Sequence, residues 1–301
     1  MPFEIALTCL SLLGLIAYWW AIVPARRIAV GTTLTAPWAW LIGGLGMWSA
    51  AWAAWAASIA FHASQGLVDR MGYLSAVSLL APPIAVLGAR RPGGAVWGWF
   101  VVLPMLCVLG LPAVSGAWWG GEMAGRLRLD APPLIGFALV LVMGVGNYVG
   151  TRFTPAALVY GLALLLQVAP ASAFGVNVRP GPLMFRAGAT LCLGLAAWLA
   201  VRAGRRVPRR QEPLDALWIE FRDLFGVVWA KRSLERVNHS ARAQQWPVRL
   251  HLDGFAPLEG PADSRLDRET AKKIEDLLRW LLKRFVDEEW IDRRIGTAAR
   301  G

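Results

Sequence analysis

Long runs of apolar residues separated by short polar stretches dominate the first two-thirds of the chain. An α-helix needs about 20 mainly apolar residues to cross a lipid bilayer. Runs of roughly this length cover residues 4–23, 35–59, 71–89, 96–117, 132–150, 155–174 and 182–203. The third run is interrupted by Pro82-Pro83 and the sixth by Pro170, so these two are the least regular. The pattern predicts an all-α integral membrane protein with about seven transmembrane helices over residues 1–203.

The pattern changes from residue 204, where apolar and charged side chains intermingle. Apolar residues recur at helical spacing over 213–243 and predict an amphipathic helix. Alternating residues over 247–253 predict a short strand, and a second apolar stripe predicts a helix over 265–292. Residues 204–301 are therefore expected to form a small, mainly helical tail.

The distribution of charge supports this division. Hydrophobic residues make up 56% of the chain and charged residues 17%. Residues 1–203 hold 11 basic and 4 acidic side chains, against 20 and 16 in residues 204–301. The net charge of +11 does not indicate a nucleic-acid partner, because the arginines of the apolar part are scattered and the tail mixes both signs. We expect the lipid bilayer to be the partner of the first part.

The arginines also predict the orientation of the chain. The odd-numbered runs are followed by ten basic residues, which are Arg26, Arg27, Arg90, Arg91, Arg152, Arg202, Arg205, Arg206, Arg209 and Arg210. The alternate connections hold four, which are Arg70, Arg126, Arg128 and Arg179. Basic residues accumulate in cytoplasmic loops, so we expect the N-terminus outside and the tail in the cytoplasm. The use of 27 Arg against 4 Lys is typical of a GC-rich bacterial genome and indicates a bacterial inner membrane.

The sequence shows no catalytic or metal-binding motif. Metalloprotease, phosphate-loop and nucleophile-elbow patterns are all absent. Cys9, Cys107 and Cys192 lie inside apolar runs, which does not favour a disulfide framework or a thiolate zinc site. His62 is the one histidine near the apolar part, whereas a haem held between helices needs two facing axial ligands. We expect no cofactor, no bound metal and no catalytic residue.

Three polar side chains inside the predicted spans form a candidate intramembrane site. They are Arg186, about one turn from the outer end of the seventh run, Asn147 and Gln167. For Arg186 the less costly arrangement is to extend toward the outer interface. The alternative is a buried anion or substrate contact, with Glu122 or Asp130 as its partner. Hydrogen bonds between helices account for Asn147 and Gln167 without transport.

The second apolar run has two different faces. Trp48, Trp52 and Trp55 share one face, and small residues that include Gly43 and Gly46 share the other. Small residues let membrane helices approach closely, so we expect the small face to pack against a neighbour. An aromatic ligand groove on the tryptophan face is the alternative.

The first tail helix carries a wide aromatic stripe of Trp218, Phe221, Phe225 and Trp229. Two short helices do not cover so much apolar surface. We therefore expect an exposed patch around Trp218 and Trp229 that docks to the membrane face or to another subunit.

These patterns favour a non-catalytic accessory, scaffold or signalling-adaptor subunit that acts through its cytoplasmic tail, by binding a protein partner or by self-association. The layout is similar to the input half of some bacterial sensor proteins, although no phosphoacceptor histidine box or nucleotide-binding glycine motif follows. The alternative is a small-molecule or lipid transporter, or a lipid-handling membrane enzyme, with a neutral polar pocket. A transporter should show a midplane cavity or broken helices, and an adaptor an exposed apolar patch on the tail.

Overall fold

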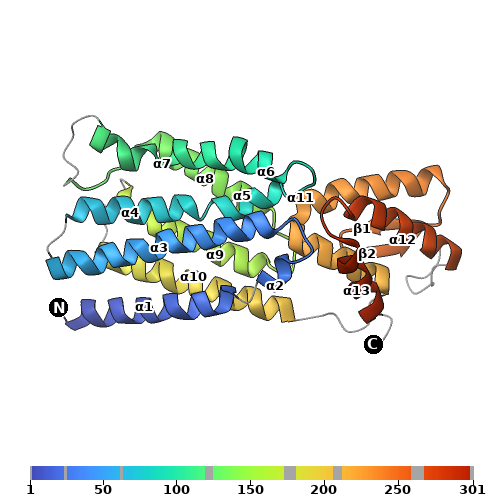
Figure 1. Ribbon diagram of the computed structural model, residues 1–301, viewed down its shortest axis with the longest axis horizontal. Helices are drawn as coiled ribbons and strands as arrows, with labels where there is room; N and C mark the ends of the chain where they lie inside the picture. Colours follow the sequence, from blue (N-terminus) through green and yellow to red (C-terminus); the bar gives the residue numbers. More distant parts are fainter. Residues whose placement is uncertain are drawn as a thin grey trace.

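The structure is a computed structural model that describes residues 2–23, 26–61, 64–118, 125–172, 181–205, 212–258 and 268–298. Several residues singled out in the sequence lie outside these ranges: His62, Glu122, Arg179, Arg206, Arg209 and Arg210. The chain is mostly helical. It forms an elongated helical bundle with the tail elements packed at one end, and the N-terminus lies at the opposite end (Figure 1).

The bundle is built from apolar helices that run side by side along the long axis of the molecule (Figure 1). The long helices are α1 (Pro2–Ile22), α3 (Thr35–Phe61), α4 (Gln65–Ser78), α7 (Leu103–Trp118), α8 (Ala131–Gly146), α9 (Thr154–Val168) and α10 (Pro182–Arg205). Shorter segments are α2 (Arg26–Ala29), α5 (Ala81–Leu87), α6 (Gly94–Trp97), the π-helical η2 (Gly98–Val102) and the 3-10 turn η3 (Ala169–Ala171).

Five stretches of the described residues are long and apolar enough to cross a membrane. They are Ile5–Ala29, Gln65–Leu87, Gly98–Ser115, Thr154–Ala171 and Pro182–Arg205. The apolar helix α8 is shorter, and α3 has the length but is rich in tryptophan and glycine, which contribute little to hydropathy. An all-α protein with several membrane-type helices is thus confirmed.

The predicted third span differs from the structure at its start and in its middle. Its helix begins at Gln65, because the Ser64 hydroxyl accepts a hydrogen bond from the Leu67 N–H and caps the first turn. The run is then divided into α4 and α5, with Pro82 and Pro83 in the first turn of α5. Proline is tolerated there because backbone N–H groups in the first turn have no partner within the helix. Asp69 consequently lies inside a helix rather than in a connection.

The predicted packing of α3 is wrong, because the tryptophan face is the buried one. The indole N–H groups of Trp48 and Trp52 both donate to the Thr190 hydroxyl of α10, at 3.1 and 2.8 Å. No atom lies within 4 Å of where a Cβ on Gly43 or Gly46 would stand, so this face remains open. Two buried indoles need a polar partner, and Thr190 supplies it.

The tail consists of α11 (Pro213–Ala243), the antiparallel hairpin β1 (Val248–His251) and β2 (Gly254–Pro257), α12 (Arg268–Leu282) and α13 (Glu288–Ala298). The helix predicted over 213–243 has these bounds, but its backbone is non-helical at Gly226. The strand predicted over 247–253 is the first strand and turn of the hairpin. The single helix predicted over 265–292 is wrong, because the chain leaves the helix after Leu282 and contacts the bundle before α13 begins.

The hairpin is anchored on α11 by Asp215. Its carboxylate accepts a hydrogen bond from the Phe255 N–H at 2.7 Å. Gly254 has φ +134°, and a Cβ there would stand 2.6 Å from the Asp215 carboxylate, so only glycine fits. Burial raises the pKa of the Asp215 carboxyl above its usual value, and the bond from Phe255 partly opposes this.

Candidate functional site

The most extensive polar contacts between distant segments lie where the tail meets the bundle. Three hydrogen bonds of 2.8 Å join backbone groups: the Thr33 N–H donates to the Phe285 carbonyl, the Asp287 N–H to the Gly31 carbonyl, and the Arg91 N–H to the Arg284 carbonyl. The Arg91 guanidinium also pairs with Asp287 at 2.5 Å. These contacts hold the segment between α12 and α13 out of a helix, which explains the break that periodicity missed.

Asn147, which follows α8, joins the bundle to the kink in α11. Gly226 has φ 80° and ψ 175°, so neighbouring backbone groups lose their helical partners. The Asn147 side chain donates to the Phe225 carbonyl at 3.2 Å and accepts from the Val228 N–H at 3.1 Å. Its own carbonyl accepts from the Val227 N–H at 2.8 Å. One buried residue thus satisfies three backbone groups of the tail, and a side chain at position 226 would collide with it.

Asp223 lies close to these contacts and adds charge to them. We call the contacts that Asn147 and Asp223 make between the bundle and the tail the joint. The Asp223 side chain is fully buried and lies 3.2 Å from Arg152, in the connection after α8, and 2.9 Å from Arg222. Arg222 also pairs at 2.8 Å with Asp253, whose side chain is 95% exposed. A buried carboxylate is tolerated when opposite charges and hydrogen bonds surround it. Helical periodicity alone does not show that Asp223 is buried, because its partner Arg152 comes from a distant connection of the bundle.

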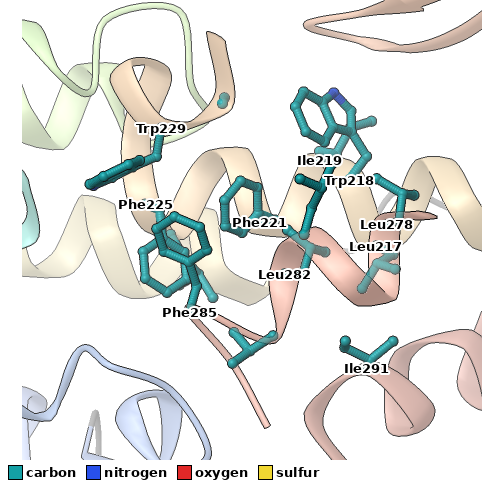
Figure 2. Packing of buried hydrophobic residues seen from close by; sticks show 14 of the residues in the cluster. Leu217, Trp218, Ile219, Phe221, Phe225, Trp229, Leu278, Leu282, Phe285 and Ile291 are labelled. Atoms are coloured by element: carbon teal, nitrogen blue, oxygen red, sulfur yellow. The ribbon is translucent and has the colours of Figure 1, made fainter. Parts of the chain in front are cut away.

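The predicted docking patch is wrong, because the aromatic stripe of the tail is covered by the protein itself. Trp218, Phe221 and Phe225 have no exposed surface, and Trp229 is 7% exposed. The rings of Phe221 and Phe225 stack at 5.1 Å, and Phe285 meets each of them edge-on at 5.2 Å (Figure 2). The Trp229 indole donates to the Val86 carbonyl of α5 at 3.1 Å. The prediction failed because it counted only the tail as cover, whereas bundle residues such as Val86 and Ala89 also pack against the stripe.

A second buried polar cluster lies toward the N-terminal end of α4, on the side of the bundle away from the tail. The carboxylate of Asp69 accepts hydrogen bonds from Arg126 at 2.5 Å and from Arg186 at 2.8 Å. Arg186 is 6% exposed and its guanidinium lies 5.2 Å from the centre of the Trp55 ring. The prediction that Arg186 extends to the outer interface is therefore wrong. Its partner is Asp69 rather than Asp130, because α4 extends far enough to bring Asp69 beside α10.

Gln167 of α9 borders this cluster. Its amide donates to the Gly72 carbonyl at 3.3 Å and contacts the Ser75 hydroxyl at 3.4 Å. A Cβ at Gly72 would stand 3.2 Å from Gln167 Nε2 and 3.7 Å from Arg186 Nε, so both side chains lie against Gly72. Arg186 Nη1 and Gln167 Oε1 are buried and have no hydrogen-bond partner among the described residues. The predicted site is thus divided: Arg186 and Gln167 lie together, whereas Asn147 belongs to the joint with the tail.

No group of three or more His, Cys, Asp or Glu side chains within the described ranges lies close enough together to hold a metal ion. The described residues form two buried polar centres instead, one toward each end of the bundle, and neither resembles a nucleophile with its base. Comparison with known protein families, characterised proteins and solved structures found no match to this chain.

Proposed function

We propose that the chain is a non-catalytic, multi-pass protein of the bacterial inner membrane that acts as an accessory, scaffold or signalling-adaptor subunit. Its seven apolar segments cross the bilayer, with the N-terminus outside and the tail in the cytoplasm. The tail is the part that meets a protein partner or a second copy of the chain. It does so while fixed to the inner end of the bundle, so that a change in the packing of the spans reaches the tail.

The joint around Asn147 and Asp223 carries this proposal. A tail that served only as a flexible tether would need no buried charge and no hydrogen bonds to three separate connections of the bundle. Buried polar contacts of this kind tolerate few alternative geometries, so they favour a defined orientation of the tail. The arginine-rich connections with Arg26, Arg91 and Arg152 lie at the same end as the tail, which supports an inward orientation of both.

The topology is tested with a single cysteine at Ser240 in a chain whose three native cysteines are replaced by alanine. We expect a membrane-impermeant maleimide to label the cysteine only after the cells are opened. Labelling in intact cells would reverse the proposed orientation.

The adaptor role is tested by in-cell photo-crosslinking from the apolar side chains that the tail does expose. Leu252, Leu258 and Trp280 are suitable positions, and the exposed Leu139 of α8 is the control on the bundle. We expect a protein adduct of defined mass from at least one tail position and none from Leu139. Only lipid adducts from every position would contradict the adaptor role.

One observation favours the alternative, a transporter of small molecules or lipids. The unpartnered Nη1 of Arg186 beside Gln167 is a donor that an anionic substrate would satisfy. Uptake of a labelled anion into proteoliposomes that is lost in Arg186→Gln, with the fold intact, would support transport over the adaptor role.

A further inference from the structure

A pocket of about 500 Å³ lies between α11, the end of α12 and the connection after α5. Its wall includes four arginines, Arg90, Arg232, Arg236 and Arg284. Trp229 and Phe285, two rings of the tail core, provide its apolar lining. Glu235 is the one carboxylate among its lining residues, so the wall carries three net positive charges when His239 is neutral. Its volume is that of a small-molecule site.

None of these four guanidinium groups is paired with a carboxylate within the described parts of the chain. Their neighbour Arg91, by contrast, pairs with Asp287. Two of the four are held over aromatic rings: Arg232 lies 5.0 Å from the centre of Trp229, and Arg284 lies 5.5 Å from that of Trp280. Like charges gathered around one opening repel each other, so an anion between them would lower the energy of the folded protein.

The pocket lies where the tail meets an apolar helix. Arg90 follows the stretch Gln65–Leu87, which is long and apolar enough to cross a membrane. Trp229, which lines the pocket, donates to the carbonyl of Val86, within the last turn of that stretch. A ligand that combines an anionic group with an apolar part would meet the arginines and the aromatic lining together.

We propose that this pocket binds a phosphate-bearing anion, either the headgroup of an anionic phospholipid or a soluble phosphate ester. Guanidinium groups match phosphate geometry through paired hydrogen bonds, and four arginines line this pocket with Glu235 as the one carboxylate among its lining residues. The lipid source rests on the proposed membrane location, whereas the soluble source does not. Binding at this position would link the end of α5 to α11 and α12, and would regulate how firmly the tail is held.

The test uses the purified full chain in a neutral detergent and the double variant Arg232→Gln/Arg236→Gln. Both arginines are exposed, so the replacement leaves the core untouched. The matched control is Arg249→Gln/Arg268→Gln, which removes two exposed tail charges that do not line the pocket. Circular dichroism verifies that each variant is folded. Binding of short-chain phosphatidylglycerol, phosphatidylcholine and glycerol 3-phosphate is then measured by titration calorimetry.

We expect one of the phosphate probes to bind the wild type, and to bind the double variant roughly a hundredfold more weakly, since one hydrogen bond to a charged group corresponds to about tenfold in affinity. The control variant should retain wild-type affinity. Preference for phosphatidylglycerol over phosphatidylcholine identifies a lipid headgroup, and binding of glycerol 3-phosphate alone identifies a soluble ligand. Equal affinities of wild type and double variant for every probe, or an equal loss in the control, would overturn the proposal. The glycerol 3-phosphate titration needs no bilayer, so its outcome is independent of the membrane topology.

Discussion

The bundle exposes many more large apolar side chains than the tail does among the described residues. On the bundle, Trp20, Trp99 and Trp198 are more than half exposed, among many exposed leucine, isoleucine and valine side chains. In the tail, Trp218 and Trp290 are fully buried. Many exposed apolar side chains on one surface are typical of a protein surrounded by lipid, because large contiguous apolar patches are rare on proteins in water. The bundle therefore has a surface compatible with a membrane location, whereas the tail buries most of its large apolar side chains.

The bundle and the tail each bury a carboxylate that is paired with arginines. Asp69 in the bundle and Asp223 in the tail each lie between two arginines and have almost no exposed side-chain surface. They differ in what they connect. Asp69 joins α4 to α10 and to Arg126 before α8, all within the bundle, whereas Asp223 joins the tail to the bundle. Variants at the two centres should accordingly destabilise different parts of the molecule.

Gly226→Ala should have the largest effect, and it should be confined to the tail and its joint. The positive φ and the collision with Asn147 should together cost about 4 kcal/mol, since backbone strain and overpacking each contribute of order 1–3 kcal/mol. Amide hydrogen exchange on the purified chain measures the loss of protection in α11. Gly296→Ala, where a Cβ meets nothing within 4 Å, is the control and should be neutral or stabilising. Equal hydrogen-exchange protection of α11 in the two variants would show that the tail does not require the kink at Gly226.

Asp223→Ala should have the second-largest effect on stability, because it leaves Arg152 and Arg222 without their buried partner. We expect a loss of about 3 kcal/mol, as found when one partner of a buried pair is removed. Asp253→Ala removes the exposed carboxylate from the same Arg222 and should cost less than about 1 kcal/mol. Denaturant unfolding, followed by the fluorescence of a dye attached to a single cysteine in the tail, compares the stabilities of the two variants. Similar midpoints for both variants would show that burial of Asp223 does not stabilise the joint.

Arg186→Gln should cost about 2 kcal/mol, less than Asp223→Ala because Arg126 still pairs with Asp69. Hydrogen exchange should increase in α4 and α10 and remain unchanged in α11. Arg202→Gln, at an exposed position of α10, is the matched control and should change neither. Loss of protection in the tail would mean that the two polar centres are coupled.

Trp229→Phe should have the smallest effect of the four, about 1 kcal/mol, since it removes one hydrogen bond to Val86 and little apolar volume. Trp280→Phe changes a half-exposed tryptophan of the same tail and should alter stability by less than about 0.5 kcal/mol. Thermal unfolding of the full chain measures both. A larger loss from Trp280 would indicate that its exposed ring is covered by another molecule or segment.

The apolar helices, the change of character after residue 203 and the bounds of α11 are predictable from the sequence, because each depends on local composition and periodicity. The clustering of basic connections at the end of the bundle that holds the tail also follows from the sequence. Cytoplasmic orientation remains a prediction of that same pattern.

Which surfaces and charges meet depends on how distant segments pack in the folded chain. Periodicity shows that Trp218 and Trp229 share an apolar face, but not that Phe285 and the bundle cover it. Asp69 and Arg186 are 117 residues apart, so their pairing depends on how α4 and α10 pack. The break before α13 likewise depends on hydrogen bonds to connections more than 190 residues away. Local sequence fixes the free energy of each segment on its own, whereas burial and ion pairing depend on neighbours that only the folded chain supplies.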